Sequence, residues 1–226
     1  MNVMGNIPAM SAGKAVEELS ALYINAIKND VAVSSLPSVF LWGPPGVGKS
    51  DLVYEIADTI EKRTQKKVLV TDIRLLLFSP VDLKGVPAPD EERKFSQWLL
   101  PKIFDLPEDE DYINMIFLDE LSAAPPSIQA TAYQITLNHM IGEHKLPDNT
   151  IVMAAGNRVT DRSVAYRMPN ALANRLMHFD ITVNFESWRE WAVHHGINPF
   201  VLGYLTYDRS KLYDPTFTTE FRKASK

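Results

Sequence analysis

The stretch SVFLWGPPGVGKSDLVYEIAD (38–58) determines the fold around which the rest of the chain must be built. SVFLW is a short apolar run that predicts a buried strand, and the residues after Ser50 have the apolar period of a helix. GPPGVGKS (43–50) lies between them and matches the pattern G-x-x-x-x-G-K-S in its required strand-to-helix setting. A Gly-rich turn that arose by chance is the alternative, and the flanking strand and helix argue against it.

The residue types in this turn predict a phosphate-binding loop. Glycines let the backbone wrap closely around phosphate oxygens, and the helix N-terminus adds amide donors and a partial positive charge. Lys49 is expected to reach the β- and γ-phosphates, and the Ser50 hydroxyl to bind Mg²⁺. We therefore expect a nucleoside triphosphate and Mg²⁺ as the cofactors, and the family resemblance given below implies that the nucleotide is ATP. The expected nucleotide-binding residues are Gly43, Pro44, Pro45, Gly46, Val47, Gly48, Lys49, Ser50 and Asp51.

Two later strands end in polar residues that suit the same chemistry. IFLDE (116–120) places Asp119 to hold magnesium together with Ser50, and Glu120 to act as a general base towards water. AAGN (154–157) places Asn157 to bond the γ-phosphate or the attacking water. A turn-capping carboxylate pair and an Asn in a left-handed turn are the alternatives. In open parallel sheets, ligands bind at the carboxyl ends of strands, where all these residues fall.

Strand and helix patterns alternate along the chain, which predicts an α/β fold with a parallel, doubly wound sheet. The segment 79–112 is proline-rich and irregular, and we interpret it as an insertion or a long loop. Strands are expected at 38–42, 66–75, 114–120, 149–157 and 176–183, and helices at 13–30, 51–63, 125–140, 168–175, 187–196 and 199–208.

Composition excludes several classes of protein. The 226 residues are 46% hydrophobic and 23% charged, with a net charge of −5, which is typical of a globular domain and disfavours a dedicated nucleic-acid binder. The absence of cysteine excludes disulfides and thiolate metal sites and fits a cytoplasmic protein. No apolar run reaches the ~18 residues that indicate a membrane span, so no membrane partner is expected.

Several motifs, taken in order, resemble an AAA+ ATPase of the MoxR-like branch, in the helix-2-insert clade. The stretches that carry the resemblance are DLKGVP (82–87), LDELSAAPPSIQATAYQ (118–134), IGEHKLP (141–147), AAGNR (154–158) and MPNALANRLMHFDI (168–181). The resemblance implies a three-layer P-loop NTPase core at 36–184 with a parallel five-stranded sheet and a helix-2-type insert near 79–105. The resemblance covers roughly residues 36–205 and further implies a hairpin at 140–150. The family normally continues into a helical lid, and here only a short, partial lid is expected at 185–226. The apolar period of residues 13–30 predicts an N-terminal helical segment at 1–35.

The same resemblance implies residue roles. Asn157 matches the sensor-1 residue, and Arg175 in NALANRL (170–176) matches the arginine finger that completes a neighbouring subunit's site. The expected catalytic residues are therefore Lys49, Glu120, Asn157 and Arg175. A local salt bridge is the alternative for Arg175, and the nearby Arg158, Arg162 and Arg167 remain rival fingers. The family's helical lid normally carries a second sensor arginine, and this role is not transferred to Arg222.

The resemblance implies an ATP hydrolase that forms a homo-oligomeric ring, typically a hexamer, and remodels client proteins in a chaperone-like way. Proteins with a von Willebrand A domain are frequent partners of this branch. Two alternatives stay open: a nucleic-acid-associated motor, and an ATP-dependent switch with little turnover. Phe95 and Trp98 in the insertion either grip a client or cover the insertion's own small core.

Overall fold

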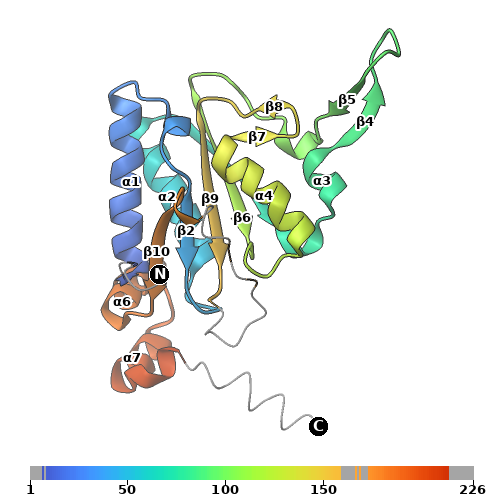
Figure 1. Ribbon diagram of the computed structural model, residues 1–226. Coiled ribbons are helices and arrows are strands. Elements are labelled where there is room, and N and C mark those ends of the chain that lie inside the picture. The colour runs from blue at the N-terminus through green and yellow to red at the C-terminus, as the bar shows by residue number, and fades with distance from the viewer. Residues whose placement is uncertain (1–6, 8, 159–165, 167, 169–172, 214–226) are drawn as a thin grey trace, which may run out of the picture.

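The central feature of the protein is a parallel sheet of six strands in the order β1-β10-β2-β9-β6-β3 (Figure 1). The computed structural model describes residues 7, 9–158, 166, 168 and 173–213. Helices cover both faces of the sheet, which confirms the predicted three-layer α/β P-loop fold. The strands are β1 (Ala9–Ser11), β2 (Val39–Trp42), β3 (Lys67–Arg74), β6 (Tyr112–Asp119), β9 (Thr150–Gly156) and β10 (Met177–Thr182).

Alternating side chains of β2 face two separate hydrophobic cores. Val39 and Leu41 pack into a core with α1 (Ala12–Lys28) and α2 (Lys49–Thr64), whereas Phe40 and Trp42 pack into a core with α4 (Pro126–Asn138). All four side chains are almost completely buried. A strand that is buried on both faces has a continuous apolar sequence, which explains why SVFLW has no polar alternation.

The sheet has one strand more than the five that the sequence predicts. β1 pairs in parallel with β10, so that Met10 lies opposite Ile181, and its last residue caps α1. The Ser11 side chain accepts a hydrogen bond of 3.3 Å from the Lys14 amide. Residues 9–28 thus belong to the same packed body as the phosphate loop.

The strand order brings the carboxyl ends of the motif-bearing strands together. β2 lies beside β9 with Trp42 opposite Gly156, and β6 lies on the other side of β9 with Leu118 opposite Ala154. The residues that follow these positions therefore leave the sheet at its carboxyl edge, where the strands end. This carboxyl edge carries the candidate site.

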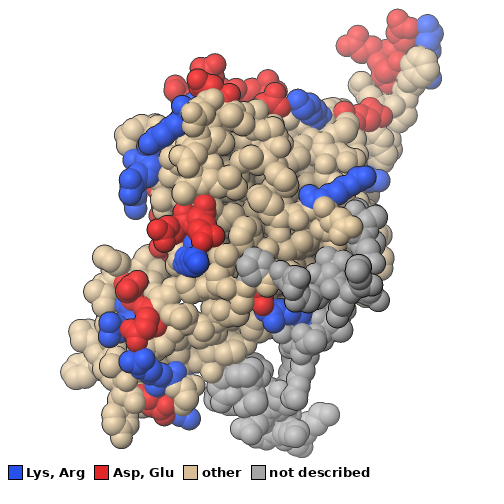
Figure 2. Space-filling view, turned by 60° about the vertical axis from the view of Figure 1, so that its left-hand side comes forward, with Lys and Arg blue, Asp and Glu red and all other residues tan. Residues whose placement is uncertain are grey.

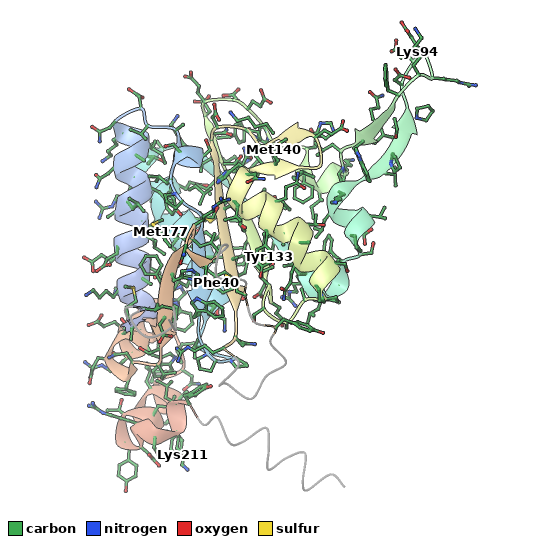
Figure 3. All side chains as sticks on the ribbon, viewed as in Figure 1. Phe40, Lys94, Tyr133, Met140, Met177 and Lys211 are labelled. Carbon is green, nitrogen blue, oxygen red and sulfur yellow. The ribbon has the colours of Figure 1, made fainter. Side chains whose placement is uncertain are left out.

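Two β-hairpins lie towards the opposite edge of the sheet (Figure 1). The predicted irregular segment contains the short helix α3 (Pro80–Lys84) and a hairpin of β4 (Val86–Pro89) and β5 (Ser96–Leu99), which projects from the body with Lys94 near its tip (Figure 3). The second hairpin, β7 (Met140–Ile141) and β8 (His144–Lys145), leads into β9. His144 Nε2 lies 2.7 Å from the carbonyl oxygen of Trp98, so the two hairpins touch.

The β4–β5 hairpin does not bury its two aromatic side chains equally. Phe95 is 75% exposed, whereas Trp98 is half-buried and lies against the β7–β8 turn. The interpretation that both aromatic residues cover a small core of the insertion is therefore wrong for Phe95. Its ring is available on the projecting hairpin.

The two helices after the sheet differ in how they pack. α6 (Phe185–His194) contacts α1, and Ser187 Oγ accepts a hydrogen bond of 3.2 Å from the Gly13 amide. α7 (Pro199–Tyr207) has no buried residue. The helix expected at 168–175 lies largely outside the described residues. None of the described helices is both long and apolar enough to cross a membrane.

Candidate functional site

The phosphate loop connects β2 to α2 at the carboxyl edge of the sheet, as the sequence predicts. Gly46 and Gly48 have φ angles of 81° and 87°, a region that side chains other than glycine rarely adopt. No atom lies within 4 Å of a Cβ built on either residue. The space beside this stretch of backbone is therefore open, as a loop that wraps around phosphate groups requires.

The Lys49 ammonium is surrounded by oxygen atoms of the loop and of the residue after β9. Its Nζ donates to the carbonyl oxygens of Gly43 at 2.7 Å and Pro44 at 2.9 Å, and to Asn157 Oδ1 at 3.1 Å. Lys49 and Asn157 are 108 positions apart in the chain. The sequence predicts that both act on the terminal phosphate, and the structure places them in direct contact.

The end of β6 lies against the first turn of α2. Ser50 Oγ donates to Asp119 Oδ2 at 3.2 Å, and the other carboxylate oxygen of Asp119 accepts from the Glu120 amide at 2.8 Å. Glu120 is exposed and has a φ angle of 59°, so the chain turns sharply at this residue. Left-handed backbone at a residue other than glycine costs free energy and is frequent at functional sites.

Ser50 and Asp119 are the residues that fit a magnesium ion. A hydroxyl and a carboxylate are hard oxygen donors, and Mg²⁺ is usually held by one or two protein groups, several waters and substrate phosphates. Among the described residues, no group of three or more His, Asp or Glu side chains is placed to hold a metal. The Ser50 hydroxyl and the Asp119 carboxylate suit a metal that arrives with a nucleotide.

Ser122 is a site residue that the sequence analysis missed. Its Oγ accepts a hydrogen bond of 2.9 Å from the Asn157 amide, and its side chain is buried. A Cβ on Gly156 would lie 2.7 Å from Ser122 Oγ and 3.0 Å from the Phe40 ring, so only glycine fits there. Ser122 and Gly156 together fix the backbone from which Asn157 extends. Nothing in the local sequence marks the Ser122 hydroxyl, because its partner is distant in the chain.

The candidate arginine fingers differ in their surroundings. Arg158 forms an ion pair with Asp180 of β10, and 30% of its side chain is exposed. Arg175 is exposed, and within the part of the chain that the structure describes it has no hydrogen-bond or ion-pair partner. Arg162 and Arg167 lie outside the described residues. Of the two that can be compared, Arg175 is the one whose guanidinium is available to another molecule.

A hollow of about 640 Å³ lies near the amino ends of β3, β6 and β9, away from the motifs. Its lysines are already engaged, since Lys145 pairs with Asp148 at 2.8 Å and Lys66 donates to the Glu110 carbonyl oxygen. It is also lined by Asp30 and Glu108. The hollow therefore has no surplus positive charge for phosphate, and the glycine-rich edge is the better nucleotide site.

Residues 39–187 match the family described as "ATPase family associated with various cellular activities (AAA)". This range begins with β2 and includes the phosphate loop, Asp119, Glu120 and Asn157. The chain belongs to the AAA family. A comparison with curated proteins gives no significant sequence match.

Solved structures with the same fold include two that are similar to this AAA chain over most of its length. PCH-2 of C. elegans is 19% identical with a TM-score of 0.51, and the match covers 83% of this chain and 48% of that one. A mutant of RuvB from Thermotoga maritima is 17% identical with a TM-score of 0.50, and the match covers 83% of this chain and 51% of that one. The AAA chain therefore spans about half the length of these proteins. At this identity the similarity shows the fold alone.

Proposed function

We propose that the protein is a Mg-ATP hydrolase whose active site is completed by a neighbouring copy of the chain. The observation that carries this proposal is the convergence of Lys49, Ser50, Asp119 and Asn157 through hydrogen bonds at one edge of the sheet. These residues come from three different parts of the chain, and a purely structural role would not require an open glycine loop beside them.

Each of these four residues, and Glu120 beside them, has a distinct task in the proposed reaction. Lys49 binds the terminal phosphates, and Asn157 orients the γ-phosphate or the attacking water. Glu120 accepts a proton from that water as its oxygen bonds to the γ-phosphorus and the bond to the bridging oxygen breaks, which releases ADP. A magnesium ion bound by Ser50 and Asp119 would neutralise charge on the β- and γ-phosphates.

Arg175 is proposed to act in the ATP site of the adjacent subunit. A guanidinium is planar and permanently charged, which suits stabilisation of charge on a transferring phosphoryl group. The exposure of Arg175 supports this role, as does the engagement of Arg158 with Asp180. A ring, with six subunits as the expected number, would place each Arg175 beside a neighbour's phosphate loop.

We further propose that the chain belongs to the MoxR-like branch and remodels client proteins. The motifs quoted above support the branch, and the projecting β4–β5 hairpin with its exposed Phe95 offers a surface for a client. Proteins with a von Willebrand A domain are the proposed partner class. The alternative of a nucleic-acid motor is disfavoured by the net charge of −5 and by the scattering of Lys and Arg among acidic residues on the face in Figure 2.

The test is phosphate release per subunit over a wide range of protein concentration, for the wild type, Arg175→Ala and the matched surface control Arg63→Ala. We expect specific activity to rise with concentration in the wild type and the control. Removal of a finger that acts in trans is expected to lower the rate by about 10³- to 10⁵-fold while ATP binding is retained.

Two results would contradict the proposal. Activity that does not depend on concentration and is retained in Arg175→Ala would show that each chain completes its own site. Tight ATP binding with no phosphate release at any concentration would favour the ATP-dependent switch instead.

A further inference from the structure

A histidine on β10 joins the phosphate-loop strand to the turn that carries Arg175. Trp42 Nε1 donates a hydrogen bond of 2.9 Å to His178 Nδ1, and His178 Nε2 lies 2.7 Å from the Ala173 carbonyl oxygen. Because Nδ1 accepts, the ring proton is on Nε2, which donates to Ala173. Both ring nitrogens are thus used, and the neutral imidazole is the form that fits.

The ring is held by packing as well as by hydrogen bonds. The rings of Trp42 and His178 are nearly parallel, with centroids 6.0 Å apart, and the ring of Phe40, labelled in Figure 3, lies 5.9 Å from that of His178. Burial lowers the pKa of His178 below its ordinary value, and this supports the neutral form. The histidine therefore has one orientation and one proton arrangement.

The two ends of this link are both adjacent to proposed catalytic groups. Trp42 directly precedes Gly43, the first residue of the phosphate loop. Ala173 begins the turn in which Arg175 is exposed, and the Met177 amide at the other end donates to the Ser38 carbonyl oxygen at 2.9 Å. The backbone of the turn is thus attached at both ends to the chain around β2, while Arg175 is left exposed.

We propose that His178 is a positioning residue which, with Trp42, clamps the Ala173–Met177 turn and sets the direction of Arg175. This inference rests on the proposed role of Arg175 in a neighbour's site. If β2, the strand before the phosphate loop, shifts, Trp42 and His178 would move with it. Their contacts would then move the turn that carries Arg175, the arginine that enters the neighbouring subunit's site. His178 would thereby couple the state of one ATP site to the completion of another.

The simpler alternative is a histidine that only fills the core. The two roles differ in whether the loss of His178 impairs the chain's own ATP site or the arginine that it supplies to its neighbour. His178→Phe keeps an aromatic ring but removes both hydrogen bonds, and Trp42→Phe removes only the indole donor. The exposed His194 gives a matched control in His194→Phe. Loss of the clamp should leave a chain's own ATP binding intact and impair only the arginine that it supplies.

Hydrogen exchange of the backbone amides of residues 173–178 tests the clamp without any activity. We expect exchange to be faster in His178→Phe and Trp42→Phe than in the wild type and His194→Phe, by about fivefold or more for the loss of one or two hydrogen bonds. Unchanged exchange in both variants would overturn the clamp, whether or not the protein hydrolyses ATP.

Mixing two variants tests the effect on Arg175. His178→Phe has an intact general base and a loosened finger, whereas Glu120→Gln lacks the base and keeps the finger clamped. We expect each to be slow alone and their mixture to release phosphate faster than the sum of the two. Faster exchange without any gain on mixing would overturn the link to Arg175. Wild-type activity that is independent of concentration and is retained in Arg175→Ala would instead overturn the proposed function, and hydrogen exchange would still decide the clamp.

Discussion

The Nζ atom of Lys49 lies 3.1 Å from Oδ1 of Asn157, so the phosphate loop and the end of β9 are joined directly. The same ammonium also bonds the carbonyl oxygens of Gly43 and Pro44. A phosphate that enters the loop must therefore compete with these oxygens for Lys49. Any movement of Lys49 towards a phosphate changes the hydrogen bonding of Asn157 at the same time.

Lys49→Ala is expected to weaken ATP binding. Hydrogen bonds to charged groups contribute about 1.5–3 kcal/mol, which corresponds to a loss of roughly tenfold to a hundredfold in affinity. Titration with a fluorescent ATP analogue measures the change. Lys62→Ala, in the last turn of the same helix, is the control and should bind as the wild type does. Equal weakening in both variants would indicate a general charge effect instead.

Glu120→Gln is expected to bind ATP normally and to release phosphate about 10²- to 10⁴-fold more slowly, because a general base contributes that factor. The amide keeps the size of the side chain at this left-handed position. Single-turnover phosphate release is the measurement, with Glu143→Gln, exposed in the β7–β8 turn, as the control. A variant that hydrolyses at the wild-type rate would assign the base to another group.

Gly156→Ala is expected to lower the free energy of unfolding by about 1–3 kcal/mol, because overpacking of a tight site forces its neighbours apart. The added methyl group would meet Ser122 and Phe40, and its displacement would move Asn157. Gly203→Ala is the matched control, since nothing lies within 4 Å of a Cβ there. Alanine at position 203 in α7 should raise the free energy of unfolding slightly, because alanine has the higher helix propensity. Urea denaturation of both variants measures the difference.

Stability is expected to fall as the pH falls below 6.5. Burial lowers the folded-state pKa of His178 below its ordinary value of 6.5, and the pKa of His139 is shifted in the same direction by the same cause. The unfolded chain then binds more protons than the folded chain, so the free energy of unfolding decreases as pH falls from 6.5 towards the folded pKa. Above 6.5 this contribution is complete.

The control for this pH dependence is His178→Phe, in which one of the two titrating groups is removed. Its free energy of unfolding should depend less steeply on pH than that of the wild type. Denaturation between about pH 5 and 8, the range in which histidine titrates, measures both. The charged residue nearby on β10 is Asp180, which pairs with Arg158 from the segment after β9. An equally steep dependence in the variant would assign the titration to other residues.

The fold and the meeting of the motifs follow from the sequence because local patterns carry them. SVFLW, the glycine loop and the helix after it specify one strand-loop-helix unit, and strand ends of a parallel sheet share an edge. The sequence alone therefore predicts Asp119 and Asn157 beside the phosphate loop. The contacts of Lys49 and Ser50 agree with that expectation.

The rest depends on contacts between positions that are distant in the chain. β1 has only three residues, too few for any period to appear, and it is stabilised by pairing with β10. The pairing of Arg158 with Asp180 and the hydrogen bond from Asn157 to Ser122 require knowledge of strand order. The β4–β5 hairpin lies in a proline-rich stretch that hides its alternation, so the sequence indicated only an irregular loop.

β9 has a consequence for the energetics of the whole molecule. Its seven residues are all buried and span roughly 20 Å at the usual rise of a strand, from the contacting hairpins to Asn157. A ligand that binds the hairpins and shifts this strand would be expected to alter nucleotide affinity. Thermodynamic reciprocity then requires nucleotide to alter the affinity for that ligand by the same factor. A measurement at either end of β9 thus reports on the other.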